Sequence, residues 1–71
     1  MKYCLVADDG QARAVTNESD DVLRIQRFAE RNSTAWWLIS STAKWHVCER
    51  QPSPSGDHLI TIETWEKGVK L

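Results

Sequence analysis

The stretch that decides the fold is KYCLVADDGQARAVTNESDDVLRIQRFAER, residues 2–31. It opens with two short runs that favour strands, residues 2–7 and 12–16, separated by the sequence DDGQ at residues 8–11. Asp-Gly between two such runs is a strong hairpin signal, because a type I′ turn needs a positive φ at both central residues. The two runs are therefore predicted to pair as antiparallel strands.

A helix is expected next along the chain. Asn17 or Ser19 can cap its start, and the acidic side chains that accompany them suit the positive end of a helix dipole. Within residues 20–31 the apolar side chains recur at helical spacing on one face, namely Val22, Ile25, Phe28 and Ala29. That face is predicted to pack on a sheet, and the helix is predicted to end at residues 32–33.

Three more strands are predicted after the helix, at residues 34–40, 44–50 and 58–65, because these runs are rich in Trp, Ile, Val and Thr. Alternation places Trp45 and Val47 toward the core. In the last strand it places Trp65 on the face opposite the core. The segment 51–57, which is rich in Pro, Ser and Gly, is predicted to be a flexible loop inside the domain.

A chain of 71 residues forms one domain, residues 1–71, with a small core. The predicted class is α+β, with an antiparallel sheet of about five strands in the order ββαβββ and one helix packed on one face. Small cores are often stabilised by association. A homodimer is therefore expected, formed through a tryptophan-bearing face or an open sheet edge. The charges of Lys67 and Lys70 would partly protect the C-terminal edge from such pairing.

The charge balance bears on partners and on location. Nine Lys and Arg residues against ten Asp and Glu residues give a net charge of -1, without the basic excess that phosphate binding usually requires. The N-terminus turns acidic at Asp8, and no run of 18 apolar residues is present, so neither a signal peptide nor a membrane partner is expected. The predicted location is the cytoplasm, where Cys4 and Cys48 would be reduced and serve as small buried hydrophobic residues.

Chemical motifs are weak. His46 and Cys48 share a strand face, and with Cys4 and His58 they make up the ligand inventory of a Cys₂His₂ zinc site, but the spacing lacks the paired ligands of structural zinc sites. A cysteine–histidine dyad could activate a thiolate. Nothing else around Cys48 supports catalysis, and a small chain can hardly enclose a substrate. No metal, no cofactor and no enzymatic activity are therefore expected.

Recognition of a partner protein is the function that the sequence favours. Arg24, Arg27 and Arg31 form a basic stripe on the predicted helix, opposite its apolar face. The stripe could equally be a solvated face whose charges pair with neighbours such as Glu30. Trp and Arg are enriched at binding hot spots, so the predicted partner-binding residues are Arg24, Arg27, Arg31, Trp36 and Trp65.

The expected function is that of a small regulatory or inhibitory module that docks onto a partner protein and occludes its surface. Small chains of this kind, phage-encoded ones included, often act in this way, which is an analogy from size alone. The alternative is binding of single-stranded nucleic acid, with bases stacked on sheet tryptophans and phosphates held by Lys44, Arg50 or the helix arginines.

Overall fold

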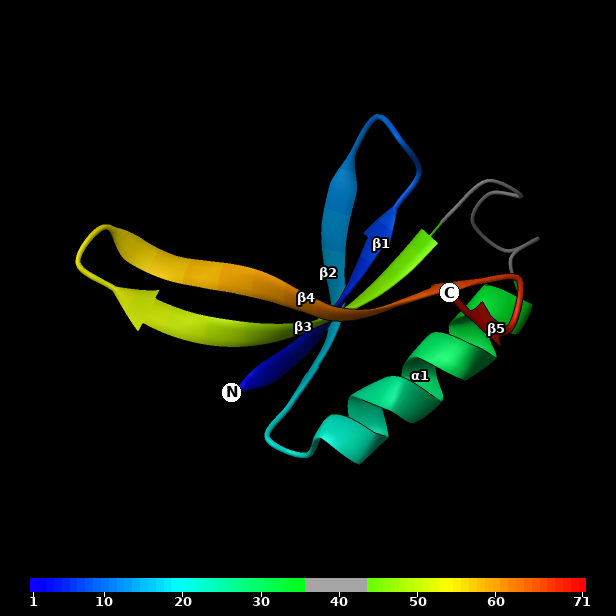
Figure 1. The fold of residues 1–71 in the computed structure, drawn as a ribbon, viewed down its shortest axis with the longest axis horizontal. Helices are drawn as coiled ribbons and strands as arrows, with labels where there is room; N and C mark the ends of the chain where they lie inside the picture. The colour runs from blue at the N-terminus through cyan, green and yellow to red at the C-terminus, as the bar shows by residue number, and fades with distance from the viewer. Residues whose placement is uncertain (36–43) are drawn as a thin grey trace.

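The computed structural model describes residues 1–35 and 44–71, and it confirms a small α+β domain. Its elements are β1 (Tyr3–Asp8), β2 (Arg13–Ser19), α1 (Val22–Thr34), β3 (Lys44–Ser53), β4 (Gly56–Glu66) and β5 (Val69–Lys70). The strands form one antiparallel sheet in the order β2-β1-β3-β4-β5 (Figure 1). The predicted order ββαβββ is therefore confirmed.

The first hairpin forms as predicted, but its turn is not of type I′. The loop covers residues 9–12 and is closed by the Asp9 N–H, which donates to the Ala12 carbonyl at 3.3 Å. Only Gly10 in this loop has a positive φ. The Asp9 carboxylate instead accepts the N–H groups of Gln11 and Ala12, and this local bonding competes with the two-residue turn. β2 has a bulge at Thr16, and beyond it β2 continues to pair with β1 as far as Ser19.

The helix begins later than predicted. Asn17 and Ser19 lie in β2, and the cap is Asp21, whose carboxylate accepts the Leu23 N–H at 3.0 Å. Asp is among the preferred N-cap residues because it can bond an otherwise unpaired N–H in this way.

The helix also ends later than predicted, at Thr34. Ser33 is fully buried: its hydroxyl donates to the Glu30 carbonyl and accepts the N–H of Gly68, both at 3.1 Å. The turn between β4 and β5 thus satisfies polar groups in the last helical turn, which prolongs the helix.

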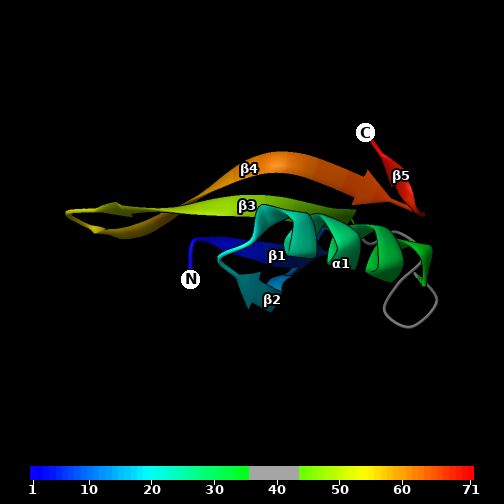
Figure 2. The same ribbon diagram turned by 90° about the horizontal axis from the view of Figure 1, so that it is seen from below.

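The helix covers one face of the sheet, and no other described element covers the opposite face, which is called the uncovered face below (Figure 2). Ile25 and Ala29 pack against Leu5, Trp45 and Val47, and all five side chains are buried. The inward orientation predicted for Trp45 and Val47 is therefore confirmed. Burial of such side chains is the main stabilising contribution in a domain of this size.

The segment predicted as a loop at residues 51–57 is mostly strand. β3 and β4 pair as far as Ser53 and Gly56, which leaves only residues 54–55 between them. The pairing includes Pro52, which lies opposite Asp57, whereas Pro54 lies in the turn. The arm projects beyond the helix (Figure 1).

The prediction of which side chains face the core is wrong for the C-terminal half of the last long strand, β4. A bulge leaves Ile62 without a partner, because Thr61 pairs with Cys48 while Glu63 pairs with Val47. An extra residue inverts which side chains face the core. Trp65 therefore packs against the core, whereas Ile62 is 48% exposed.

The strand predicted at residues 34–40 is contradicted at its start, since Thr34 closes the helix and Ala35 caps it. Residues 36–40 lie outside the described residues. The fifth strand of the sheet is instead β5, which pairs with the end of β4.

Candidate functional site

The uncovered face of the sheet carries a cavity of about 230 Å³. Its walls come from β1, β2, β3, β4 and are mostly apolar, with Val6, Val15 and Leu59 around the polar groups of Arg13, His46, Cys48 and Thr61. Side chains on this face are brought together because the register aligns Val6 with both Val15 and His46, and Cys48 with Thr61. A mixed apolar and polar hollow of this kind is the usual place to search for a ligand site.

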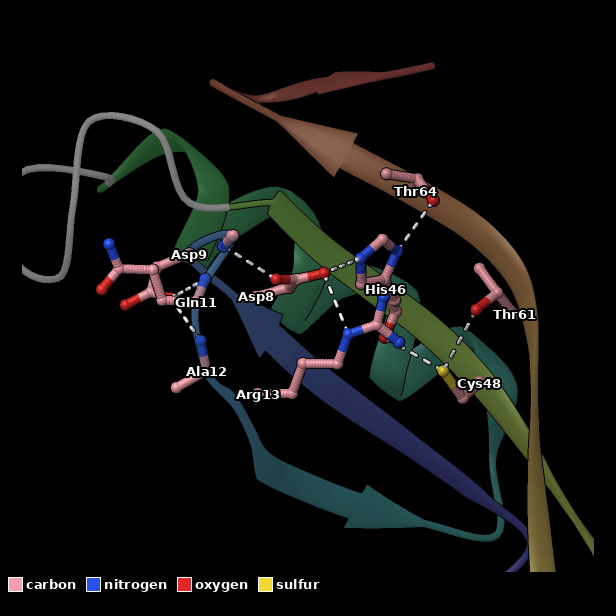
Figure 3. A network of polar contacts seen from close by, with 10 residues as sticks. Asp8, Asp9, Gln11, Ala12, Arg13, His46, Cys48, Thr61 and Thr64 are labelled. Atoms are coloured by element: carbon pink, nitrogen blue, oxygen red, sulfur yellow. Dashed lines mark hydrogen bonds and ion pairs between the residues drawn. The ribbon is translucent and has the colours of Figure 1, made fainter.

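Four strands are linked across this face by a chain of polar contacts (Figure 3). The His46 Nε2 lies 3.2 Å from the Asp8 carboxylate, and its Nδ1 lies 3.0 Å from the Thr64 hydroxyl. Arg13 also contacts Asp8, with Nε at 3.1 Å. The imidazole is therefore held at both ring nitrogens, between β1 and β4.

The Asp8 carboxyl is held in its ionised form. Its pKa is lowered chiefly by the N–H of Gly10, which it accepts, and further by His46 and Arg13. An ionised carboxylate only accepts hydrogen bonds, so His46 Nε2 donates to it. In the neutral imidazole, Nδ1 then accepts the Thr64 hydroxyl.

A hydroxyl that is hydrogen-bonded to an imidazole, which is itself hydrogen-bonded to a carboxylate, is the arrangement that activates hydroxyl nucleophiles. Here the Thr64 hydroxyl does not line the cavity, although His46 does. Because the Thr64 hydroxyl lies outside the lining of this cavity, we assign the contacts of Asp8, His46 and Thr64 to holding three strands together.

Cys4 and Cys48 are neighbours on the same face. They are direct partners in the pairing of β1 with β3, and both are free, buried thiols. The expectation that they act as small buried hydrophobic residues is confirmed, since they pack with Val6. Burial raises the pKa of the Cys48 thiol, an effect that the nearby Thr61 hydroxyl partly offsets.

Next to this pair, Arg50 forms ion pairs with two strands. Its guanidinium contacts Glu18 on β2 and lies 3.8 Å from Asp57 on β4. The neighbouring Cys4 thiol, Glu18 and Asp57 raise the pKa of Arg50 above its usual value. Because the Arg50 guanidinium is already paired within the sheet, it is less available for the phosphate contact that the sequence suggested.

The opposite surface of the molecule is the outer face of α1. Arg24, Arg27 and Arg31 are all exposed there, as predicted, and Leu23 beside them is 62% exposed. Within residues 1–35 and 44–71, none of the three guanidinium groups lies within ion-pair distance of a carboxylate. A shallow hollow of about 370 Å³ is lined by Arg27, Glu30, Arg31 and Thr34.

The two tryptophans predicted to join the arginines have different outcomes. Trp36 lies outside the described residues. Trp65 is half-buried on the helix side, where its ring N–H donates to Glu63 at 3.1 Å, and Glu63 in turn accepts from Gln26 on α1 at 2.7 Å. A role for Trp65 in partner binding stays a prediction, but this tryptophan does not point away from the core.

The close approach of Cys4 to Cys48 is the feature that sequence reasoning missed. The strands that carry these residues are adjacent only because β3 lies beside β1, and no local pattern specifies that order. Across the part of the chain that the structure describes, no group of three or more His, Cys, Asp or Glu side chains could hold a metal ion.

Comparisons of this chain with protein-family models, curated proteins and solved structures gave no match. In the described parts of the chain, no helix has the length and apolar character needed to cross a bilayer.

Proposed function

We propose that this chain is a small cytoplasmic regulatory module that docks onto a partner protein through the outer face of α1 and occludes the surface it covers. The observation that carries the proposal is the set of three exposed guanidinium groups, Arg24, Arg27 and Arg31, without carboxylate partners among the described residues. Guanidinium groups that are not committed within the fold can make fork-like hydrogen bonds to a partner's carboxylates.

An exposed apolar side chain accompanies these charges. Leu23 lies one position before Arg24, on the solvent side of the helix, and contributes nothing to the core. Arginine is among the residues enriched at binding hot spots, and Leu23 adds apolar contact area beside the three arginines. The partner surface that fits this face is acidic, because a local basic patch attracts acidic groups even when the net charge of the chain is -1.

Nucleic-acid binding through sheet tryptophans has less support. Trp45 is buried beneath the helix, and Trp65 lies on the same side of the sheet. Neither offers a ring face on the uncovered side where a base could stack.

Self-association remains part of the proposal. Within the described residues, β5 pairs with Trp65 and Glu66, and the Leu71 N–H donates to the Thr64 carbonyl at 2.8 Å, so the outer edge of β4 is open before Thr64. Ile60 and Ile62 beside this edge are about half-exposed. Edges of this kind pair readily with another strand, and we expect a second copy of the chain to be that strand.

The docking proposal is tested by charge reversal. The variant R24E/R27E/R31E is compared with K2E/K44E/K70E, which makes the same change in net charge at three other exposed positions. Proteins captured by the wild-type chain from its native host are identified by mass spectrometry, and their binding to each variant is then measured. The proposal predicts that the helix variant loses the partner and that the lysine variant retains it. Equal binding by both variants would refute docking through α1.

An oligonucleotide titration tests the alternative function, binding of single-stranded nucleic acid. If tryptophan fluorescence is quenched at low salt and the quenching weakens as salt is added, the chain binds single strands. Absence of quenching at low salt removes that alternative.

A further inference from the structure

The structure carries a second feature, independent of the helix face, in the paired cysteines of the uncovered sheet face. We propose that Cys4 and Cys48 are a dithiol that a hydroperoxide oxidises to a disulfide between β1 and β3. Oxidation begins at Cys48 and is completed by Cys4.

The backbone already places the two residues at disulfide spacing. The Arg50 N–H donates to the Lys2 carbonyl at 2.7 Å, so Lys2 and Arg50 are a hydrogen-bonded pair of the ladder. Hydrogen-bonded pairs recur at every second residue, which makes Cys4 and Cys48 a pair of the same kind. The Cα atoms of such pairs are about 5.5 Å apart, within the range that disulfides span.

The two side chains also lie in one buried cluster with Val6, on the uncovered face of the sheet. Rotation of both side chains brings the sulfur atoms toward each other, since the backbone spacing lies within the disulfide range.

Only one of the two sulfur atoms can be reached from solvent. Cys48 lines the cavity of about 230 Å³ on the uncovered face, whereas Cys4 does not line it and is 0% exposed. One water molecule occupies about 30 Å³ of liquid volume, so a small hydroperoxide fits in the cavity. The first reaction must therefore take place at Cys48.

The chemistry balances in two steps. The Cys48 thiolate attacks one oxygen of the hydroperoxide, the O–O bond breaks, and the leaving alkoxide or hydroxide takes up the thiol proton, which leaves a sulfenic acid. The Cys4 sulfur then attacks the Cys48 sulfur, and the displaced hydroxyl leaves as water with the Cys4 proton. Two thiols and one hydroperoxide give one disulfide, one alcohol and one water, and two electrons pass to the peroxide.

Neighbouring groups set the rates of the two steps. Burial raises the pKa of Cys48, so the first step is slow at neutral pH and accelerates as pH rises. Cys4 is the direct partner of Cys48 in the pairing of β1 with β3, so the second step is intramolecular and fast. The sulfenic acid is therefore short-lived in the wild-type chain.

The folded protein is treated with hydrogen peroxide and analysed as intact monomer. We expect a mass loss of about 2 Da, loss of both free thiols, and reversal of both changes by dithiothreitol. Because the bond closes a loop of more than 40 residues, the melting temperature should rise by about 10 °C or more. Raising the pH should accelerate the reaction.

Two single variants test the order of the steps. Cys4→Ser should stop at a sulfenic acid on Cys48 that dimedone traps, and Cys48→Ser should leave Cys4 unreactive while the chain stays folded. Circular dichroism establishes that both variants are folded. The proposal is overturned if the folded wild-type chain gives no intramolecular disulfide, if only disulfide-linked dimers form, or if Cys4 reacts equally fast in both the wild-type chain and Cys48→Ser.

Discussion

The two tryptophans on the helix side of the sheet should differ in their sensitivity to the same substitution. Trp45 is 1% exposed, and its ring N–H finds no hydrogen-bond partner among the described residues. Trp65 is half-buried, and its ring N–H donates to Glu63. Replacing each by Phe removes the same atoms from two different environments.

The expected magnitudes follow from those environments. Trp45→Phe removes two buried carbon atoms, which costs about 1.6 kcal/mol at about 0.8 kcal/mol each. It also removes a buried, unpaired N–H, whose burial costs about 1–3 kcal/mol. The two effects nearly cancel, and the free energy of unfolding should change by less than about 1 kcal/mol. Trp65→Phe loses a hydrogen bond to a charged group, worth about 1.5–3 kcal/mol when well shielded, so we expect a loss of about 1–2 kcal/mol at this half-buried site.

Urea unfolding followed by far-UV circular dichroism measures both variants, because this signal does not depend on the number of tryptophans. The deeper tryptophan should tolerate the change better. A loss of more than about 2 kcal/mol for Trp45→Phe would show that its N–H is satisfied in solution, and the reasoning would then fail.

Three other predictions concern pH, the β4–β5 turn and association. Because the pKa of Asp8 is lowered in the fold, its contribution to stability is present above about pH 4 and is lost as pH falls through the folded pKa. Melting temperatures measured from pH 7 to pH 2 should therefore fall less steeply for Asp8→Asn. Gly68→Ala should cost about 1–3 kcal/mol in urea unfolding, since Gly68 has φ 81° and a Cβ there would lie 2.7 Å from the Thr34 hydroxyl. Gly10→Ala, with φ 91° and nothing within 4 Å, should cost less. Light scattering over a dilution series should show a dimer that dissociates, and a monomer mass at every concentration would exclude self-association.

Local patterns were sufficient to predict the first hairpin, the helix and the inward faces of α1 and β3. The alternation around Trp45 and Val47 identifies the buried face of β3, and the helical spacing of Ile25 and Ala29 identifies the buried face of α1. Each of these inferences depends only on neighbours in the sequence.

Features that depend on pairing between distant segments were not predictable in this way. The bulge at Ile62 exists only relative to β3, and it changes which face Trp65 occupies. Likewise, the end of α1 depends on the contact of Ser33 with Gly68. The candidate arginines could be placed from the helix alone, whereas the opposition of Cys4 and Cys48 required the order of strands in the sheet.

The projecting β3–β4 arm offers a practical means of orienting the molecule. Its tip, Pro54 and Ser55, is exposed and lies at the far end of the molecule from the C-terminal end of α1 (Figure 1). Exposed hairpin tips with small or polar residues tolerate inserted sequence. An affinity peptide inserted between these two residues would tether the chain to a sensor surface with its arginine-bearing helix directed toward the flowing solution.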